Sequence, residues 1–261
     1  MSSFQEVSQQ VGNQLKRLFP AADRVPALSV GLSVFLVLVY LFSVANPWIL
    51  DAWCLSPQAL PNFELSRLTT YTLIHENFFH LLFNVASLYG PLSQFEVQNG
   101  TVHTAVVLNF LATFVGVPYC LCGLLFYPET SVLGASGWCF SMLSYYYYLR
   151  SQTEETVKLY RVDVPTTMVP FVFLLVVGVL VPSSSFMGHL IAIFAGYALG
   201  YGYLKHFTNP PFRLIERIEA ALDSVIDRLP AQLHYIKEHE VSQERYVLPS
   251  HAGQVLGTNR V

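Results

Sequence analysis

The sequence predicts an all-α, polytopic membrane protein with six transmembrane helices and a cytosolic amphipathic helix near its C-terminus. Of its 261 residues, 53% are hydrophobic and only 12% are charged, whereas soluble domains carry about 25% charged residues. The apolar residues gather in long segments that polar stretches separate. Lysine and arginine concentrate in alternate loops, as they do in the cytosolic loops of membrane proteins.

Six apolar segments approach or exceed the about 20 residues that a spanning helix needs. The first is too long for the core of a signal peptide, which has about 7–15 apolar residues. Four tyrosines at 145–148 end the fourth segment and suit the aromatic belt of a membrane surface. The six segments cover residues 26–48, 69–93, 101–127, 132–149, 165–182 and 186–206.

The basic residues predict the orientation of the chain. With the N-terminus in the cytosol, the loop at 150–164 and the C-terminal region lie on the same side. These three regions hold 13 of the 14 lysine and arginine residues, and only Arg67 lies across the membrane. Such a bias is typical of cytosolic regions. The sequon Asn99-Gly100-Thr101 would then face the cytosol, so we expect it to carry no glycan.

Three regions follow from this pattern: a cytosolic N-terminal segment at 1–26, a six-span domain at 27–206 and a cytosolic C-terminal region at 207–261. In the last region, apolar residues recur at helical spacing from Leu214 to Leu229, with charged residues between them, which predicts an amphipathic helix. It could lie on the membrane surface, dock a partner or pack on the protein's own loops. Residues from 237 onward have the composition of a disordered tail.

The composition excludes several classes of function. The net charge of −3 gives no indication of nucleic-acid binding, and we expect no nucleic-acid partner. The four cysteines are too few for a disulfide framework, and no metal-ligand spacing is present. We therefore expect neither a metal nor an organic cofactor.

Polar side chains inside a bilayer are costly, so each needs a reason. The first polar cluster comprises His75, His80 and Asn84 on the second segment. His80 and Asn84 are four residues apart and share one helix face. They could be hydrogen-bond donors that point into the protein, or polar contacts between helices.

The second cluster, Gly134-Ala135-Ser136-Gly137, opens the fourth segment. Its glycines allow another backbone to approach Ser136 closely. The N–H groups at a helix start are also free to stabilise developing negative charge. A serine among small residues is equally a common packing element of membrane helices.

The third cluster is Gly188-His189, near the start of the sixth segment. Residues 164–196 contain no Asp, Glu, Lys or Arg, and His189 is their only histidine. A buried histidine without an ion partner stays neutral, which is the form that a general base for serine requires. A lone histidine in a membrane helix can also be a simple interhelical hydrogen-bonding residue.

Taken together, the clusters lie on segments that all enter from the non-cytosolic side. Ser136 and His189 could therefore meet at similar depth, and donors from the second segment could complete an oxyanion site. Asp163 lies on the cytosolic side and Glu76 near the opposite surface. With no carboxylate placed to orient His189, we expect a dyad and not a triad.

These motifs, in this order on alternate segments, resemble those of the rhomboid family. The match comprises His-x4-His-x3-Asn, Gly-x-Ser-Gly and the later histidine, and it covers about residues 27–206. The likeness is closest to the fungal rhomboid protein 2 group, in the strings at 134–140, 182–189 and 253–258.

The resemblance implies an intramembrane serine protease with Ser136 as nucleophile and His189 as general base. It implies that His80 and Asn84 stabilise the oxyanion. Supporting roles fall to His75, Gly134, Gly137 and Phe140, the last as a ring packed against the histidine. It also implies single-span membrane proteins as substrates, in the bilayer of the Golgi or another secretory compartment.

The sequence departs from the family pattern in three places. The Trp-Arg pair of the first loop is Ser66-Arg67 here. The glycines that often follow the histidine by two and three residues are Ile191 and Ala192. The loop at 183–186 is short.

Three further interpretations remain. A non-proteolytic rhomboid-like membrane chaperone or dislocation factor would share the fold, but Ser136 and His189 are both present. A transporter or channel would suit inward polar groups, but the segments have almost no Asp or Glu. The C-terminal tail partly resembles short glycine-rich docking motifs, which suggests a cytosolic AAA ATPase as a partner.

Overall fold

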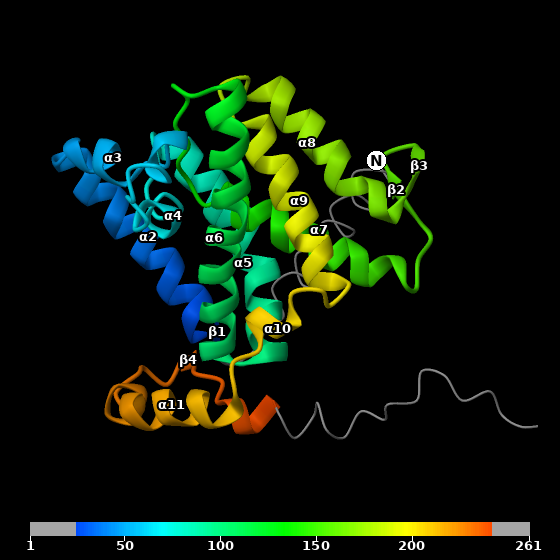
Figure 1. The fold of residues 1–261 in the computed structure, drawn as a ribbon. Helices are drawn as coiled ribbons and strands as arrows, with labels where there is room; N and C mark the ends of the chain where they lie inside the picture. Colours follow the sequence, from blue (N-terminus) through cyan, green and yellow to red (C-terminus); the bar gives the residue numbers. More distant parts are fainter. Residues whose placement is uncertain (1–24, 242–261) are drawn as a thin grey trace, which may run out of the picture.

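The computed structural model describes residues 25–241, which form a helical bundle with a smaller layer across one end (Figure 1). The bundle consists of α2 (Ala27–Ala45), α5 (Phe78–Asn99), α6 (Thr101–Phe126), α7 (Ser136–Ser151), α8 (Val169–Leu180) and α9 (Phe186–Gly200). Helix α11 (Phe212–Ile226) lies across the base (Figure 1). The direction of the chain turns by 86° between α9 and the helices that follow it.

Short elements fill the connections that the sequence predicted as loops. Between α2 and α5 lie α3 (Trp48–Trp53), η1 (Pro57–Ala59) and α4 (Arg67–Thr70), at the end away from α11 (Figure 1). An antiparallel hairpin of β2 (Thr156–Leu159) and β3 (Val162–Pro165) connects α7 to η2 (Thr166–Met168). At the base, β1 (Val25–Pro26) pairs with β4 (Leu233–His234). Helix α10 (Lys205–Thr208) connects α9 to α11.

Two predicted helix starts are wrong. The second apolar segment was predicted from 69, but α5 begins at Phe78 because the Asn77 side chain accepts the His80 N–H at 2.9 Å and caps the helix there. The fourth was predicted from 132, but Val132 is extended and pairs with Leu55. Hydropathy detects apolar content, whereas these starts depend on a cap and on a backbone pairing.

Length and composition alone qualify α2 and α6 to cross a membrane, among the helices that the structure describes. Counting α9 with its bent continuation gives at most a third. Helices α7, α8 and α9 have 16, 12 and 15 residues, fewer than the about 20 of a typical span. Helix α5 is long enough but carries polar side chains. The number of six spans therefore stays a prediction.

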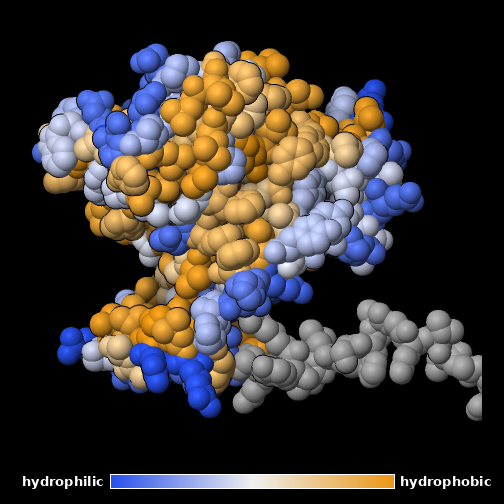
Figure 2. Space-filling model, viewed as in Figure 1, coloured by the Kyte–Doolittle hydropathy of each residue, from blue (hydrophilic) through white to orange (hydrophobic). Residues whose placement is uncertain are grey.

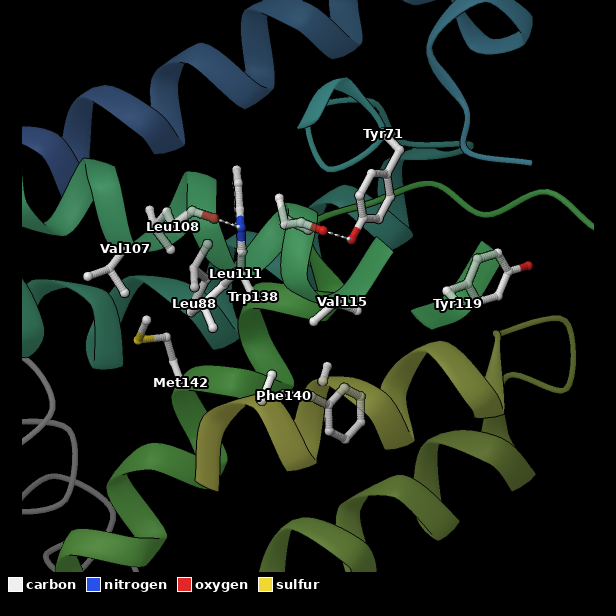
Figure 3. Packing of buried hydrophobic residues seen from close by; sticks show 14 of the residues in the cluster. Tyr71, Leu88, Val107, Leu108, Leu111, Val115, Tyr119, Trp138, Phe140 and Met142 are labelled. Carbon is white, nitrogen blue, oxygen red and sulfur yellow. Dashed lines mark hydrogen bonds between the residues drawn. The ribbon is translucent and has the colours of Figure 1, made fainter. Parts of the chain in front are cut away.

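Helix α7 lies at the centre of the core, beside α5, α6 and α9 (Figure 1). Trp138 on α7 is buried and donates its indole N–H to the Leu108 carbonyl of α6 at 2.8 Å (Figure 3). The Tyr71 hydroxyl donates to the Ala112 carbonyl of α6 at 3.2 Å. Met142, one turn beyond Trp138, is also fully buried. This packing fixes the position of α7, whose first residue is Ser136.

Helices α7 and α9 approach closely at glycine. A Cβ placed on Gly196 would collide with the Ser141 carbonyl, and one on Gly200 would collide with the Tyr148 ring. The buried Ser141 hydroxyl donates to the Ala192 carbonyl at 2.9 Å. Gly196 and Gly200 thus provide the close contact in this chain, where Ile191 and Ala192 replace the family's usual glycines.

A buried carboxylate ties the base together. The Glu96 carboxylate on α5 is fully buried and accepts hydrogen bonds at 2.8 Å from the Leu28 N–H, the Ser29 N–H, the Ser29 hydroxyl and the Thr101 hydroxyl. The first N–H groups of a helix have no intrahelical acceptor, and a negative charge there is favourable. Glu96 therefore caps α2 and joins it to α5 and α6.

The predicted disorder from 237 onward is wrong for residues 237–241. The Ile236 N–H donates to the Thr101 hydroxyl at 3.0 Å, and the Glu238 N–H donates to Glu219 of α11 at 2.9 Å. Glu238 and Val241 are buried. These long-range bonds, together with the β1–β4 pairing, hold the segment against the bundle. The predicted tail at 242–261 and the N-terminal residues 1–24 lie outside the described residues.

Replacing Glu96 with Gln should destabilise the protein by about 3 kcal/mol, because a buried amide N–H₂ would face donors in place of an acceptor. Thermal unfolding in detergent micelles measures this. The matched control is Glu154→Gln, which removes an exposed pair with Arg150 and should cost less than about 1 kcal/mol. Equal small losses for both variants would contradict the role given to Glu96.

Candidate active site

Ser136 is the first residue of α7, and a tightly held turn precedes it. Gly134 has φ of +109°, a conformation that favours glycine. Its N–H donates to the Tyr71 carbonyl at 2.8 Å. The next N–H, that of Ala135, donates to His75 Nε2 at 3.3 Å. The backbone is therefore fixed just before Ser136, whose own side chain is partly exposed.

His189 lies on the first turn of α9. The Ser185 side chain caps this helix by accepting the Gly188 N–H at 3.1 Å. His189 is buried, with 6% of its surface exposed. Its Nε2 atom lies 2.9 Å from the Ser136 hydroxyl oxygen, within the range for proton transfer from a nucleophile to a base.

The imidazole is oriented by packing. The Phe140 ring, one turn after Ser136, stacks on His189 with centroids 4.5 Å apart and an interplanar angle of 28°. The His189 Nδ1 atom is buried and has no hydrogen-bond partner among residues 25–241. Ser136 and His189 therefore form a pair without a third, orienting carboxylate in the described part of the chain.

His80 and Asn84 on α5 lie against the turn before Ser136. A Cβ placed on Gly134 would be 2.7 Å from His80 Cε1 and Nε2 and 3.3 Å from Asn84 Nδ2. Asn84 is 6% exposed, and its Nδ2 atom has no partner within residues 25–241. The first N–H groups of α7 also lack intrahelical acceptors. These donors are suited to stabilising an anion beside Ser136.

His75 and Gly137 are placed differently from what their motifs suggest. His75 precedes α5 and is not on it, because the Asn77 cap starts the helix later. It is fully buried, supports the Ala135 N–H, and has its ring edge-on to His80 at 5.2 Å. A Cβ on Gly137 would meet the Tyr71 hydroxyl at 3.7 Å, an ordinary contact, so space alone does not require glycine there.

Several residues of the site were missed from the sequence. Tyr71 acts through its main-chain carbonyl, which leaves no side-chain signal. Ser141 and Cys139 bond to carbonyls of neighbouring helices, and their spacing does not reveal these partners. Ser185 was detectable, since serine is a preferred residue at the position just before a helix start. In the described residues, no three His, Cys, Asp or Glu side chains are grouped to hold a metal.

Comparisons with known proteins identify the family to which this chain is similar. The Rhomboid domain family matches residues 62–206. The chain is 39% identical to rhomboid-type serine protease 2 of Saccharomyces cerevisiae, over 92% of this chain and 97% of that protein. It is 41% identical to the protein of the same name in Yarrowia lipolytica (82% and 72% covered) and 42% identical to that of Eremothecium gossypii (90% and 93% covered).

The chain therefore belongs to the rhomboid family of intramembrane serine proteases. Within the family, its similarity is to the fungal proteins named rhomboid-type serine protease 2. The resemblance drawn from the three motifs is confirmed.

Gly134→Ala should lower protease activity at least about tenfold. The added methyl group would press on His80, and alanine would be strained at this positive φ. Cleavage of a reconstituted substrate measures the effect. Gly31→Ala on α2 is the control, because a Cβ there meets nothing within 4 Å. Similar activity in both variants would contradict the tight fit at Gly134.

Proposed function

We propose that this protease hydrolyses peptide bonds in single-span membrane proteins with Ser136 as nucleophile and His189 as general base. The observation that carries the proposal is the distance of 2.9 Å between the Ser136 hydroxyl oxygen and His189 Nε2. A non-proteolytic, helix-binding member of the fold would have no need for this pair.

In the proposed reaction, the Ser136 oxygen attacks the scissile carbonyl while its proton moves to His189 Nε2. The tetrahedral oxyanion receives hydrogen bonds from His80, Asn84 and the Ser136 N–H. The imidazolium then gives its proton to the leaving amine, and the C–N bond breaks. Water attacks the resulting acyl-enzyme with His189 again as the base, which releases the acid and restores Ser136. The face of the Phe140 ring suits the transient imidazolium.

The substrate must present an extended backbone at the site. A spanning helix hides its carbonyls in internal hydrogen bonds, so residues that weaken the helix near the cut favour cleavage. By likeness to rhomboids, we assign single-span proteins as the substrate class. No cofactor enters the reaction as proposed.

The proposed topology has six spans and both termini in the cytosol, in a membrane of the Golgi or another secretory compartment. The proposed regions are 1–26, 27–206 and 207–261. Helix α11 is proposed to lie at the cytosolic surface, since Leu214 and Val225 expose 47% and 55% of their surface. In Figure 2, hydrophobic residues cover the side of this layer toward the bundle and hydrophilic residues its outer edge. This pattern supports an interfacial helix.

The sequon gives a test of this topology. Asn99 should carry no glycan, because the end of α5 would face the cytosol. Electrophoretic mobility before and after endoglycosidase treatment measures this. A sequon introduced between α3 and α4 should be glycosylated in the same membranes, and a glycan on Asn99 would reverse the proposed orientation.

The partner proposal concerns residues 242–261, which lie outside the described residues. Their partial likeness to glycine-rich docking motifs suggests that they bind a cytosolic AAA ATPase. Affinity purification of the full chain and of a chain ending at residue 241 would compare the amounts of ATPase that each recovers. An ATPase recovered equally with both, or with neither, would remove the proposal.

Ser136→Ala and His189→Ala should each reduce cleavage by at least about 10³-fold, because each removes one half of a cooperating pair. The assay is cleavage of a spanning-helix substrate in reconstituted bilayers at equal amounts of folded protein. Ser131→Ala and His206→Ala, which change exposed residues outside the site, should retain activity. Cleavage that persists in Ser136→Ala would refute the nucleophile.

A further inference from the structure

The thiol of Cys139 contacts Asn84, one of the proposed oxyanion donors. Cys139 is on α7, one turn after Ser136, and faces α5. Its Sγ atom is 3.4 Å from the Asn84 carbonyl oxygen and 3.8 Å from Asn84 Oδ1. A thiol is a weak donor with one proton, and both acceptors near Sγ belong to Asn84. The thiol can therefore restrain either the α5 main chain at Asn84 or the Asn84 side chain, through the same proton.

The other end of the Asn84 amide is buried without a partner. Its Nδ2 atom has no hydrogen bond within the described residues, although Asn84 is 94% buried. A Cβ on Gly134 would lie 3.3 Å from this atom, so it points at the turn that leads into Ser136. Buried donors are rarely left unpaired, and those that are need an explanation. A charge that develops only during the reaction would provide the missing acceptor.

The orientation of the Asn84 amide determines whether this side chain stabilises or destabilises the oxyanion. With Nδ2 toward Ser136, the side chain donates to the oxyanion. With the amide reversed, Oδ1 would face the same negative charge and repel it. The Cys139 Sγ atom lies 3.8 Å from Oδ1, where its S–H can donate to the amide oxygen and favour the first orientation.

We infer that Cys139 is a positioning residue that orients the Asn84 amide so that its N–H₂ group faces the developing oxyanion. This rests on the proposed function, in which Asn84 is an oxyanion donor. Ser141 makes the corresponding bond on the opposite side of α7, to the Ala192 carbonyl of α9. Cys139 thus contacts the helix that carries the proposed oxyanion donor, and Ser141 contacts the helix that carries the proposed general base.

A double-mutant cycle separates this role from simple packing. Cys139→Ala should lower kcat about tenfold with little change in KM, because the amide is aligned for the transition state and not for substrate binding. In an Asn84→Ala background, Cys139→Ala should have no further effect on kcat. Cys139→Val, which fills the space but has no donor, should behave as Cys139→Ala does.

Cys120→Ala is the matched control. The Cys120 thiol is buried and lies 3.4 Å from the Ser56 carbonyl, outside the site. Its removal should leave kcat unchanged. Melting temperatures of all variants are measured in the same micelles.

The outcomes are distinct. An equal loss of kcat in the wild-type and Asn84→Ala backgrounds would assign Cys139 a packing role and overturn the inference. Full activity of Cys139→Ala or of Cys139→Val would do the same. Full activity of Asn84→Ala would remove the proposed oxyanion donor and the inference with it, while cleavage by Ser136→Ala would be the separate failure of the proposed function.

Discussion

The close contact between α7 and α9 is the constraint on which the site depends. Lipid tails are as apolar as leucine, so helices in a bilayer associate through tight packing and interhelical hydrogen bonds. Here Gly196 rests on the Ser141 carbonyl, and the Ser141 hydroxyl bonds to the Ala192 carbonyl. Both helices start beside each other as a result, which brings Ser136 and His189 to 2.9 Å.

Two buried polar residues of α5 differ in how far their hydrogen-bonding groups are satisfied. At its base, Glu96 accepts four hydrogen bonds and has the partners that a buried carboxylate needs. At its other end, Asn84 keeps a buried donor without a partner in the described chain. His75, which precedes α5, and His189 on α9 each have a buried Nδ1 atom without a hydrogen-bond partner among residues 25–241. Three of the buried polar atoms without a partner among residues 25–241 therefore belong to residues around Ser136.

Much of this arrangement was predictable from spacing and hydropathy. The third segment was predicted at 101–127 and is the helix Thr101–Phe126. Family membership followed from three motifs in order and is confirmed by the relatives. The catalytic roles of Ser136 and His189 stay predictions, for which the short contact and the Phe140 stack provide a geometric basis.

The remainder could not be predicted, because it depends on contacts between distant parts of the chain. The start of α5 is set by the Asn77 cap, which displaces His75 from the helix. The turn before Ser136 is held by the Tyr71 carbonyl, which no side-chain pattern reveals. The placement of residues 236–241 depends on the bonds from Ile236 to Thr101 and from Glu238 to Glu219. Thr101 is more than a hundred residues away from Ile236.

The most direct test of the central claim is to map by peptide mass spectrometry where a fluorophosphonate attaches in the wild type and in Gly196→Val. The variant retains Ser136 and His189 but forces α9 away from α7, because the valine side chain would collide with the Ser141 carbonyl. We expect an adduct on Ser136 in the wild type and little or none in the variant. An adduct on another serine, or undiminished labelling of Ser136 in Gly196→Val, would contradict it.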